Sequence, residues 1–339
     1  MKKKSNFFSS KYFSLLIIIV ALLIIFTIWS KGMMLKPLNI RNILNNVVLL
    51  SFIGIGACFL MLYGEMDISS GAIGSFSACM SAMFAMNYGI PDGIAIILAL
   101  LIGCVIGFLN ALMINKLKFP PFIATMSMSY VLQGLGYLLV TALGVSIKKL
   151  PTFNFLGDTK FFDNLVPMGV LISILFLVVY GLILAKTKFG RTIYLCGGNR
   201  LAAKLCGLNP TKLSYILYIN SAFLASVSGI MYVARVKTAL PTALTSYQFT
   251  GITAAVLGGV AFGGGSGNIL GCALGMLVLA VFNNGVSTVG FNANYTTVFN
   301  GVLLIVGLAL DAINARRSAR KVVTSSLASL SKEKSENKA

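Results

Sequence analysis

Histidine is absent from this sequence, and only eight of its 339 residues are Asp or Glu. Charged residues of both signs make up 10% of the chain, where a soluble domain carries roughly 25%. So few charges cannot cover a surface that faces water. Because 57% of the residues are hydrophobic, the composition indicates an integral membrane protein whose length fits one polytopic domain.

The missing histidine also removes the commonest ligand and base of an enzyme site. The six cysteines include no CxxC pair, so neither a zinc site nor a disulfide framework is expected. The glycine-rich stretch GGVAFGGGSGNILGCALG, residues 258–275, matches neither GxxxxGK[ST] nor GxGxxG and gives no phosphate site. With no nucleophile–base pair either, we expect no catalytic residue, no metal and no cofactor.

Ten apolar runs are long enough, or nearly long enough, to cross a membrane as helices of about 20 residues. The first run is longer than the core of a signal peptide and no small-residue cleavage site follows it, so we expect an uncleaved span. Several other runs are short or interrupted by glycine, which predicts broken or re-entrant segments. The sequence thus predicts an all-α polytopic transmembrane domain over 13–314, with spans at 13–30, 47–63, 71–86, 94–114, 121–144, 165–185, 213–234, 249–262, 268–282 and 296–314.

The 27 Lys and Arg residues lie at the ends of these runs, unlike the clustered basic face of a nucleic-acid-binding protein. With the N-terminus placed inside, nineteen fall in cytoplasmic segments and eight in outer ones, as the positive-inside rule favours. We expect both termini in the cytoplasm: an N-terminus at 1–12, a long loop at 186–212 and a tail at 315–339.

The stretch YGEMDISSGAIG, residues 63–74, sets two of the eight acids between two apolar runs. One interpretation is an ordinary loop at the cytoplasmic surface with solvated acids. The other is a broken, partly re-entrant segment whose polar groups face a conduit or hold a helix end. The residues alone favour neither.

A run of three glycines at 263–265 should break the helix that precedes it. Gly267, Gly271 and Gly275 follow at intervals of four, which places them on one helix face where backbones can approach closely. Irregular backbone at membrane depth persists only when it is buried in protein or lines a cavity. The break is therefore structural, or it also touches a solute path.

Polar residues inside the predicted spans must also find partners. Bonds between helices are one use, and lining a path for a neutral polar solute is the other. The residues that we single out as forming a helix break or lining a path are Asp67, Ser69, Ser70, Gly71, Asn110, Thr125, Gly265, Gly267, Asn283, Asn284 and Asn300.

The long cytoplasmic loop contains a short amphipathic helix. Asn199 can cap its start, and Gly207 and Pro210 end it. Its apolar face consists of Leu201, Ala202, Leu205 and Leu208. The helix either lies on lipid or docks its apolar face into a groove on a soluble partner.

Five blocks, in order from about residue 40 to 314, resemble the permease subunits of ribose-type monosaccharide ABC transporters, the inner-membrane component of binding-protein-dependent transport systems. They are GEMDISSGAIG, PPFIATMSMSYVLQGLGYLL, TKFGRTIYLCGGNRLAAKLCGLNPTKLSY, FTGITAAVLGGVAFGGGSGNILGCALGMLVLAVFNNG and FNGVLLIVGLALDA. The resemblance implies an importer subunit for a pentose or hexose in the bacterial plasma or inner membrane. Its partners would be a cytoplasmic ATPase, an extracytoplasmic sugar-binding protein and a second permease, identical or similar. Since this chain has no Walker motif, ATP hydrolysis belongs to the ATPase.

The resemblance also assigns roles to residues. It identifies the short helix as the coupling helix that docks on the ATPase, through Gly197, Gly198, Asn199, Leu201, Ala202, Ala203, Leu205, Gly207 and Leu208. Where the family usually shows GGIDLSVG, this chain has Glu65-Met66 for Gly-Ile and Ser70 for Val. We therefore expect Glu65 to be solvated and tolerant, and Asp67 to accept hydrogen bonds from backbone N–H groups at the start of the next helix.

Two alternatives remain within transport. The solute could be another neutral polar molecule, such as a nucleoside or a furanosyl signal molecule. A secondary transporter driven by ions would instead take up solute without any ATPase and stop with an uncoupler.

The topology is open to a direct test. In a cysteine-free background, Lys204→Cys should be inaccessible to a membrane-impermeant thiol reagent in intact cells and accessible after permeabilisation. Cysteines placed in the external segment 145–163 should label without permeabilisation. Labelling of position 204 from outside would rule the topology out.

Overall fold

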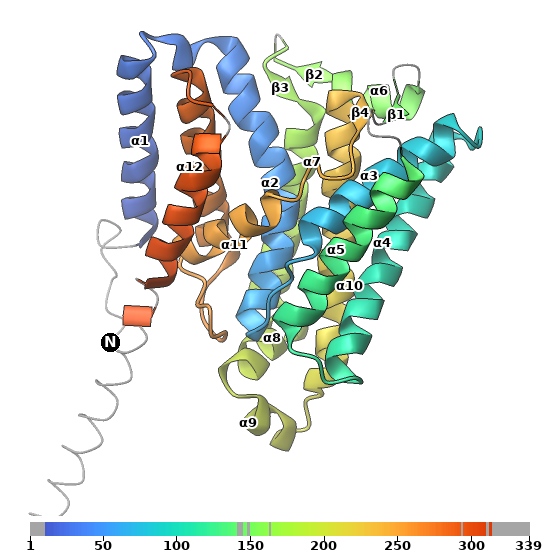
Figure 1. Ribbon diagram of the computed structural model, residues 1–339. Coiled ribbons are helices and arrows are strands. Elements are labelled where there is room, and N and C mark those ends of the chain that lie inside the picture. Colours follow the sequence, from blue (N-terminus) through green and yellow to red (C-terminus); the bar gives the residue numbers. More distant parts are fainter. Residues whose placement is uncertain are drawn as a thin grey trace, which may run out of the picture.

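The computed structural model describes residues 11–140, 145–147, 150–162, 164–292, 294–309 and 312–313. These residues form a helical bundle with two very short strand pairs (Figure 1). In chain order the elements are α1 (Lys11–Trp29), a 3-10 turn (Met33–Leu35), α2 (Pro37–Tyr63), α3 (Ser70–Met86), α4 (Asp92–Asn115), α5 (Pro121–Leu139), β1 (Val145–Ser146), α6 (Pro151–Asp158), β2 (Lys160–Phe161), β3 (Val166–Pro167), α7 (Met168–Lys186), α8 (Lys188–Gly198), α9 (Arg200–Leu205), α10 (Pro210–Val236), β4 (Thr238–Ala239), α11 (Tyr247–Leu257), α12 (Ile269–Thr288) and a last helix at Asn294–Ala309.

Each of the ten predicted spans overlaps one of these helices, which confirms the all-α polytopic class. Seven helices are long and apolar enough to cross a membrane: α1, α2, α4, α5, α7, α10 and α12. The last helix is shorter, and α3 and α11 have only 17 and 11 residues. Irregular chain precedes α3 and α11, as the prediction of short or broken segments among the ten spans indicates. The predicted tail and nearly all of the predicted N-terminus lie outside the described residues.

The centre of the bundle is formed by α2 and α10, each 27 residues long. Of their most apolar windows, 78% and 72% of residues are buried, against 17% for α1 at the edge. α10 packs against α2, α3 and α4, and α12 packs against α1, α2 and α11. Small residues permit this closeness, since a Cβ on Gly229 of α10 would lie 1.9 Å from the Gly74 carbonyl oxygen of α3.

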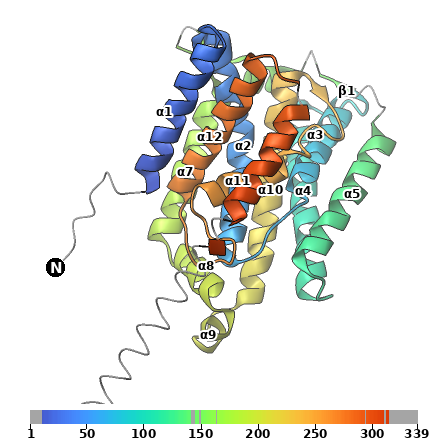
Figure 2. The ribbon, with the colours of Figure 1, turned by 60° about the vertical axis from the view of Figure 1, so that its left-hand side comes forward.

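The bundle has two distinct ends. The first residues of α1 lie at the same end as α8 and α9, called the α9 end below (Figures 1 and 2). At the opposite end lie α6 and two antiparallel strand pairs, with Val145 opposite Ala239 and Lys160 opposite Pro167. Among the described residues, the segment predicted to be cytoplasmic, 186–212, thus lies at one end of the molecule, and the segment predicted to be external, 145–163, lies at the other.

The glycines after α11 behave in two ways. Residues 258–268 contain no helix, so the expected break is present. Beyond it, a Cβ on Gly271 or Gly275 of α12 would lie 2.1 Å from a carbonyl oxygen of Gly258 or Ala254, which explains the predicted close approach of two backbones. Gly267 does not belong to this face, because it precedes α12 with φ 130°.

Candidate functional site

The chain between α2 and α3, residues 64–69, forms no helix and is called the re-entrant segment below. α2 ends at Gly64 in the left-handed conformation, with φ 85°. Figure 1 shows the segment rising from the lower end of α2 into the bundle, where α3 begins. Four of its six residues are buried. A solvated surface loop is therefore excluded, and the re-entrant interpretation fits.

The depth of the re-entrant segment can be read along α10, which lies beside it. Ser214 donates a hydrogen bond to Glu65 at 3.3 Å, and Ser221 donates one to Asp67 at 3.0 Å. Seven residues separate these serines, which is about 10 Å along an α-helix. Asp67 consequently lies near the middle of α10. This depth does not fit the interpretation of an ordinary loop at the cytoplasmic surface with solvated acids.

Asp67 holds the turn that leads into α3. Its Oδ1 accepts hydrogen bonds from the backbone N–H of Ser69 at 2.8 Å and from the Ser69 hydroxyl at 2.5 Å. Its Oδ2 accepts the bond from Ser221, and its carbonyl oxygen accepts one from Ser70 at 3.4 Å. The carboxylate accepts an N–H at the helix start, as expected, but from the residue before α3 and not from the first turn.

Neighbouring helices complete this polar cluster. Asn110 of α4 donates to the Ser69 hydroxyl at 2.8 Å, and the hydroxyl of Thr125 of α5 accepts from the Ile68 N–H at 3.2 Å. Buried polar groups need such partners, because water does not reach them. The predicted residues that meet here are Asp67, Ser69, Ser70, Gly71, Asn110 and Thr125.

Glu65 was expected to be solvated and is buried instead, with 4% of its side chain exposed. Its Oε1 lies 2.8 Å from Nη2 of Arg200, the first residue of α9. The Arg200 guanidinium also lies over the ring of Tyr63, with its carbon 4.4 Å from the ring centre. The expectation failed because a carboxylate can enter a membrane protein when a cation far along the chain accompanies it.

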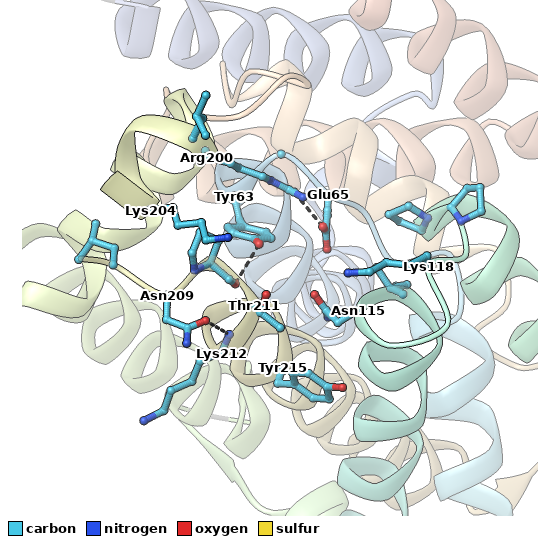
Figure 3. Close-up of a pocket in the computed structure, with 18 of the residues that line it drawn as sticks. Tyr63, Glu65, Asn115, Lys118, Arg200, Lys204, Asn209, Thr211, Lys212 and Tyr215 are labelled. Carbon is cyan, nitrogen blue, oxygen red and sulfur yellow. Dashed lines mark hydrogen bonds and ion pairs between the residues drawn. The ribbon is translucent and has the colours of Figure 1, made fainter. Parts of the chain in front are cut away.

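Figure 3 shows this ion pair at the wall of a cleft at the α9 end, with a volume of about 1450 Å³. The cleft lies between α9, the start of α10 and the turn from α4 to α5. Its lining includes Lys118, Lys204 and Lys212 besides Arg200, whereas Glu65 is its one carboxylate. The cleft is consequently electropositive at the surface, while the Glu65 charge is matched by Arg200.

Four glycines bring three segments into direct backbone contact. They are Gly64 at the end of α2, Gly197 in α8, and Gly264 and Gly265 in the break before α12, together called the glycine junction. The Gly265 N–H donates to the Leu62 carbonyl oxygen at 2.8 Å, and a Cβ on Gly197 would lie 1.9 Å from that oxygen. Gly264 and Gly265 adopt φ of 87° and 74°, which side chains disfavour. The predicted residues Gly197 and Gly265 thus fasten α8 to α2.

The short helix α9 begins and ends as the sequence indicates. The Asn199 side chain accepts a hydrogen bond from the Ala202 N–H at 3.0 Å, which is an N-cap. Gly207 follows the helix with φ 80°. The preceding helix α8 was not predicted, because its run of glycines and polar residues resembles a loop.

Leu201 and Leu205 of α9 face away from the bundle, with 70% and 81% of their surfaces exposed. Ala203 on the opposite face is buried. Leu201 lines the 1450 Å³ cleft, and a separate groove of about 310 Å³ is lined by Tyr194, Leu195, Gly198, Asn199, Ala202, Ala203, Cys206 and Leu208. Leu201 and Leu205 are four residues apart and so lie side by side on α9, which gives an exposed apolar surface of the kind that binds a partner.

A second cavity, of about 830 Å³, lies between α2, α5, α11, α12 and the last helix and reaches the re-entrant segment at Ile68. None of the described residues that line it is charged. Three lining residues, Gln248, Asn283 and Asn300, have buried side-chain oxygens without a hydrogen-bond partner among the described residues. The other lining residues are Asn46, Leu50, Met126, Ser129, Tyr130, Gln133, Thr245, Ser246, Tyr247, Phe249, Thr250, Ala280, Ser287, Phe291, Thr296, Thr297, Gly301 and Leu304.

Not every residue predicted for a path lies here. Asn284 is outside the cavity lining, and its amide donates to Met34 Sδ at 3.6 Å and to Thr288 at 3.4 Å. It joins helices instead. Gly265 and Gly267 are also outside the lining, and the Gly267 carbonyl accepts a bond from Tyr194 at 2.8 Å. The glycine break therefore has a structural role.

Two important residues were missed from the sequence. Gln248 was not singled out, although it directly precedes the apolar run 249–262. A polar amide in or next to an apolar run is the same signal that selected Asn283. Arg200 was counted only as a cytoplasmic charge, and no local pattern connects it with Glu65. Among the described residues, no group of His, Cys, Asp or Glu could hold a metal ion.

Comparisons with known proteins agree on one family. Residues 39–308 match the family described as "Branched-chain amino acid transport system / permease component". The chain is 35% identical to the ribose import permease protein RbsC of Bacillus subtilis, over 82% of this chain and 85% of that protein. It is 28% identical to the fructose import permease protein FrcC of Rhizobium meliloti (85% and 81%) and 31% identical to RbsC of Escherichia coli K12 (80% and 85%). No solved structure matches the chain.

Asp67→Ala should destabilise the protein, because it leaves the buried N–H and hydroxyl of Ser69 without their acceptor. An unsatisfied buried group costs about 1–3 kcal/mol. Asp67→Asn retains an accepting oxygen and should keep most of the stability. Thermal unfolding in detergent and abundance in membranes measure both, with Ser221→Ala as a matched control that removes one bond to the carboxylate. Equal loss in the Asn and Ala variants would show that the turn needs the charge.

Proposed function

Because the chain belongs to the permease family described as a component of branched-chain amino acid transport systems, we propose that it is the membrane-spanning subunit of an ATP-driven importer for a pentose or hexose. Membership implies an ATPase and a solute-binding protein as partners. The chain is a transporter subunit and not an enzyme, and ATP hydrolysis belongs to the ATPase. The relatives named for ribose and fructose support the choice of sugar.

The observation that carries this proposal is the chemistry of the 830 Å³ cavity. A zwitterionic amino acid would place two charges against a lining that has no charged residue, and unpaired charges in such a site are costly. A sugar carries no charge and presents several hydroxyl donors. The free oxygens of Gln248, Asn283 and Asn300 are acceptors for such donors. The volume also falls within the usual range of small-molecule sites.

The α9 end would face the cytoplasm, with both termini on that side and the multi-pass domain in the bacterial plasma membrane. The excess of Lys and Arg assigned to this side supports the orientation. The exposed leucines of α9 would then dock on the ATPase. ATP binding there would move α9, and the bundle would open the cavity alternately to each side.

The binding protein would deliver sugar at the end that carries α6 and the strand pairs. A second permease, identical or similar, would complete the path, as the resemblance implies. A nucleoside or furanosyl signal molecule is also neutral and rich in acceptors and donors, so it remains the second candidate solute.

Uptake is best tested with the complete transporter. Reconstituted with its ATPase and binding protein, the chain should take up radiolabelled ribose or fructose only when ATP is supplied. Asn283→Leu, which removes an acceptor and conserves size, should reduce uptake by about tenfold, since one hydrogen bond contributes roughly 1 kcal/mol or more. Asn284→Leu is the matched control, because it removes a neighbouring amide that lies outside the cavity. Uptake that proceeds without ATP and stops with an uncoupler would identify a secondary transporter. Uptake of a nucleoside that neither ribose nor fructose inhibits would show that the solute is a nucleoside and not a sugar.

Leu205→Asp tests docking through α9. The new carboxylate is in water in the free subunit, so membrane abundance should not change. In the complex it would be buried without a partner, at a cost of a few kcal/mol. The variant should therefore lose the ATPase on co-purification, whereas Leu205→Met should retain it. Normal co-purification of Leu205→Asp would place the helix on lipid.

A further inference from the structure

The Arg200–Glu65 ion pair connects two parts of the molecule that otherwise have separate roles. Arg200 is the first residue of α9, the helix with the exposed leucines. Glu65 belongs to the re-entrant segment, deep against α10. Two ion pairs occur in the described part of the chain, and this is the one at the α9 end. It is therefore a side-chain link between the docking helix and the segment that lies beside the cavity.

The two partners differ sharply in their surroundings. The Glu65 side chain is 4% exposed, whereas that of Arg200 is 48% exposed. Besides Arg200, the Glu65 carboxylate has neutral partners among the described residues, the Ser214 hydroxyl at 3.3 Å and the nearby Tyr218 hydroxyl. If Arg200 moved away, a carboxylate with 4% of its side chain exposed would be left with neutral donors alone, which is unfavourable. Arg200 is half exposed and can turn to water, whereas Glu65 at the wall of the cleft is nearly buried, so a movement of Arg200 favours a movement of Glu65 with it.

A displacement of Glu65 would reach the cavity within a few residues. Asp67 and Ser69, next along the chain, contact α10 and α4 through Ser221 and Asn110. Ile68 lies between them and lines the 830 Å³ cavity. The re-entrant segment begins with backbone bonds from Gly64 and Glu65 to the last turn of α2, and beyond Glu65 it is held by bonds that involve side chains, without a helical ladder of its own. Such a segment can shift by exchanging side-chain partners, which a continuous helix cannot do as readily.

The backbone contacts nearby do not replace this link. The glycine junction fastens α8 to the end of α2 and to the break before α12. The glycine junction holds α8, where the loop 186–212 leaves the bundle. One of its members, Gly64, is also the first residue of the re-entrant segment. Glycine contacts carry no charge, so they impose no electrostatic penalty on a movement of α9. The ion pair does.

We propose that the Arg200–Glu65 pair is the positioning link by which movement of the docking helix α9 is transmitted to the re-entrant segment and hence to the cavity wall at Ile68. The inference rests on the proposed function in that α9 is taken to dock on the ATPase. It assigns to Glu65 a role in coupling, and none in binding solute.

The test measures how accessible the cavity wall is to a thiol reagent at Ile68. In a cysteine-free background, Ile68→Cys is labelled in the complete transporter, with and without a non-hydrolysable ATP analogue. With the pair intact, the analogue should change the labelling rate. In Glu65→Gln, and in the double variant Glu65→Gln/Arg200→Met, that change should shrink about tenfold, within the range common for coupling between two sites. The double variant leaves no unpaired buried charge, so it guards against misfolding.

Lys204→Met is the matched control, because it removes another cation from α9 and the same cleft. It should preserve the response, and all variants should co-purify with the ATPase and hydrolyse ATP at the basal rate. An undiminished response in the double variant, an equal loss in Lys204→Met, or no response at Ile68→Cys with the pair intact would each overturn the proposal. A pair-dependent response in a transporter that takes up neither sugar would remove the proposed substrate and leave the link standing.

Discussion

Two carboxylates lie inside a nonpolar helical bundle, and each must be met by donors from elsewhere in the chain. This constraint explains why many polar side chains surround the re-entrant segment. Asp67 takes its donors from Ser69 and from Ser221 of α10. Glu65 requires a full positive charge, and it obtains one from the start of α9. The position of the loop that carries α9 against the bundle is consequently tied to the break between α2 and α3.

Local features were predictable because they depend on neighbours in sequence. The apolar runs marked the helices, and Asn199 marked the start of α9, since a cap bonds to a backbone group three residues away. The short lengths of α3 and α11 were indicated by the short apolar runs 71–86 and 249–262. The depth at which α3 begins was not predictable, because it depends on the partners that the polar groups before the helix find, and these partners come from α4, α5 and α10. The same reason explains the error at Glu65, whose partner no local pattern indicates.

The cavity shows how one family fold can carry different solutes. The family description refers to amino acids, and the relatives described above are import permeases for sugars. A zwitterionic amino acid and a sugar differ in charge, and the described residues that line this cavity are neutral. If the solute binds here as proposed, amides such as Asn283 and Gln248 would supply the polar contacts. Because an amide offers both donors and acceptors, such a site would recognise hydroxyl groups without fixing one sugar. Selection among sugars would then fall mainly to the binding protein.

The exposed leucines of α9 also bear on how the complex is produced. A copy of this chain that has no ATPase holds Leu201 and Leu205 in water, and apolar groups held in water favour contact with any similar surface. Surplus copies would thus adhere to one another or to other proteins at the inner face of the membrane. If α9 docks on the ATPase as proposed, synthesis of the two subunits in matched amounts would keep this surface covered, and the exposure of a six-residue helix would set a requirement on gene dosage.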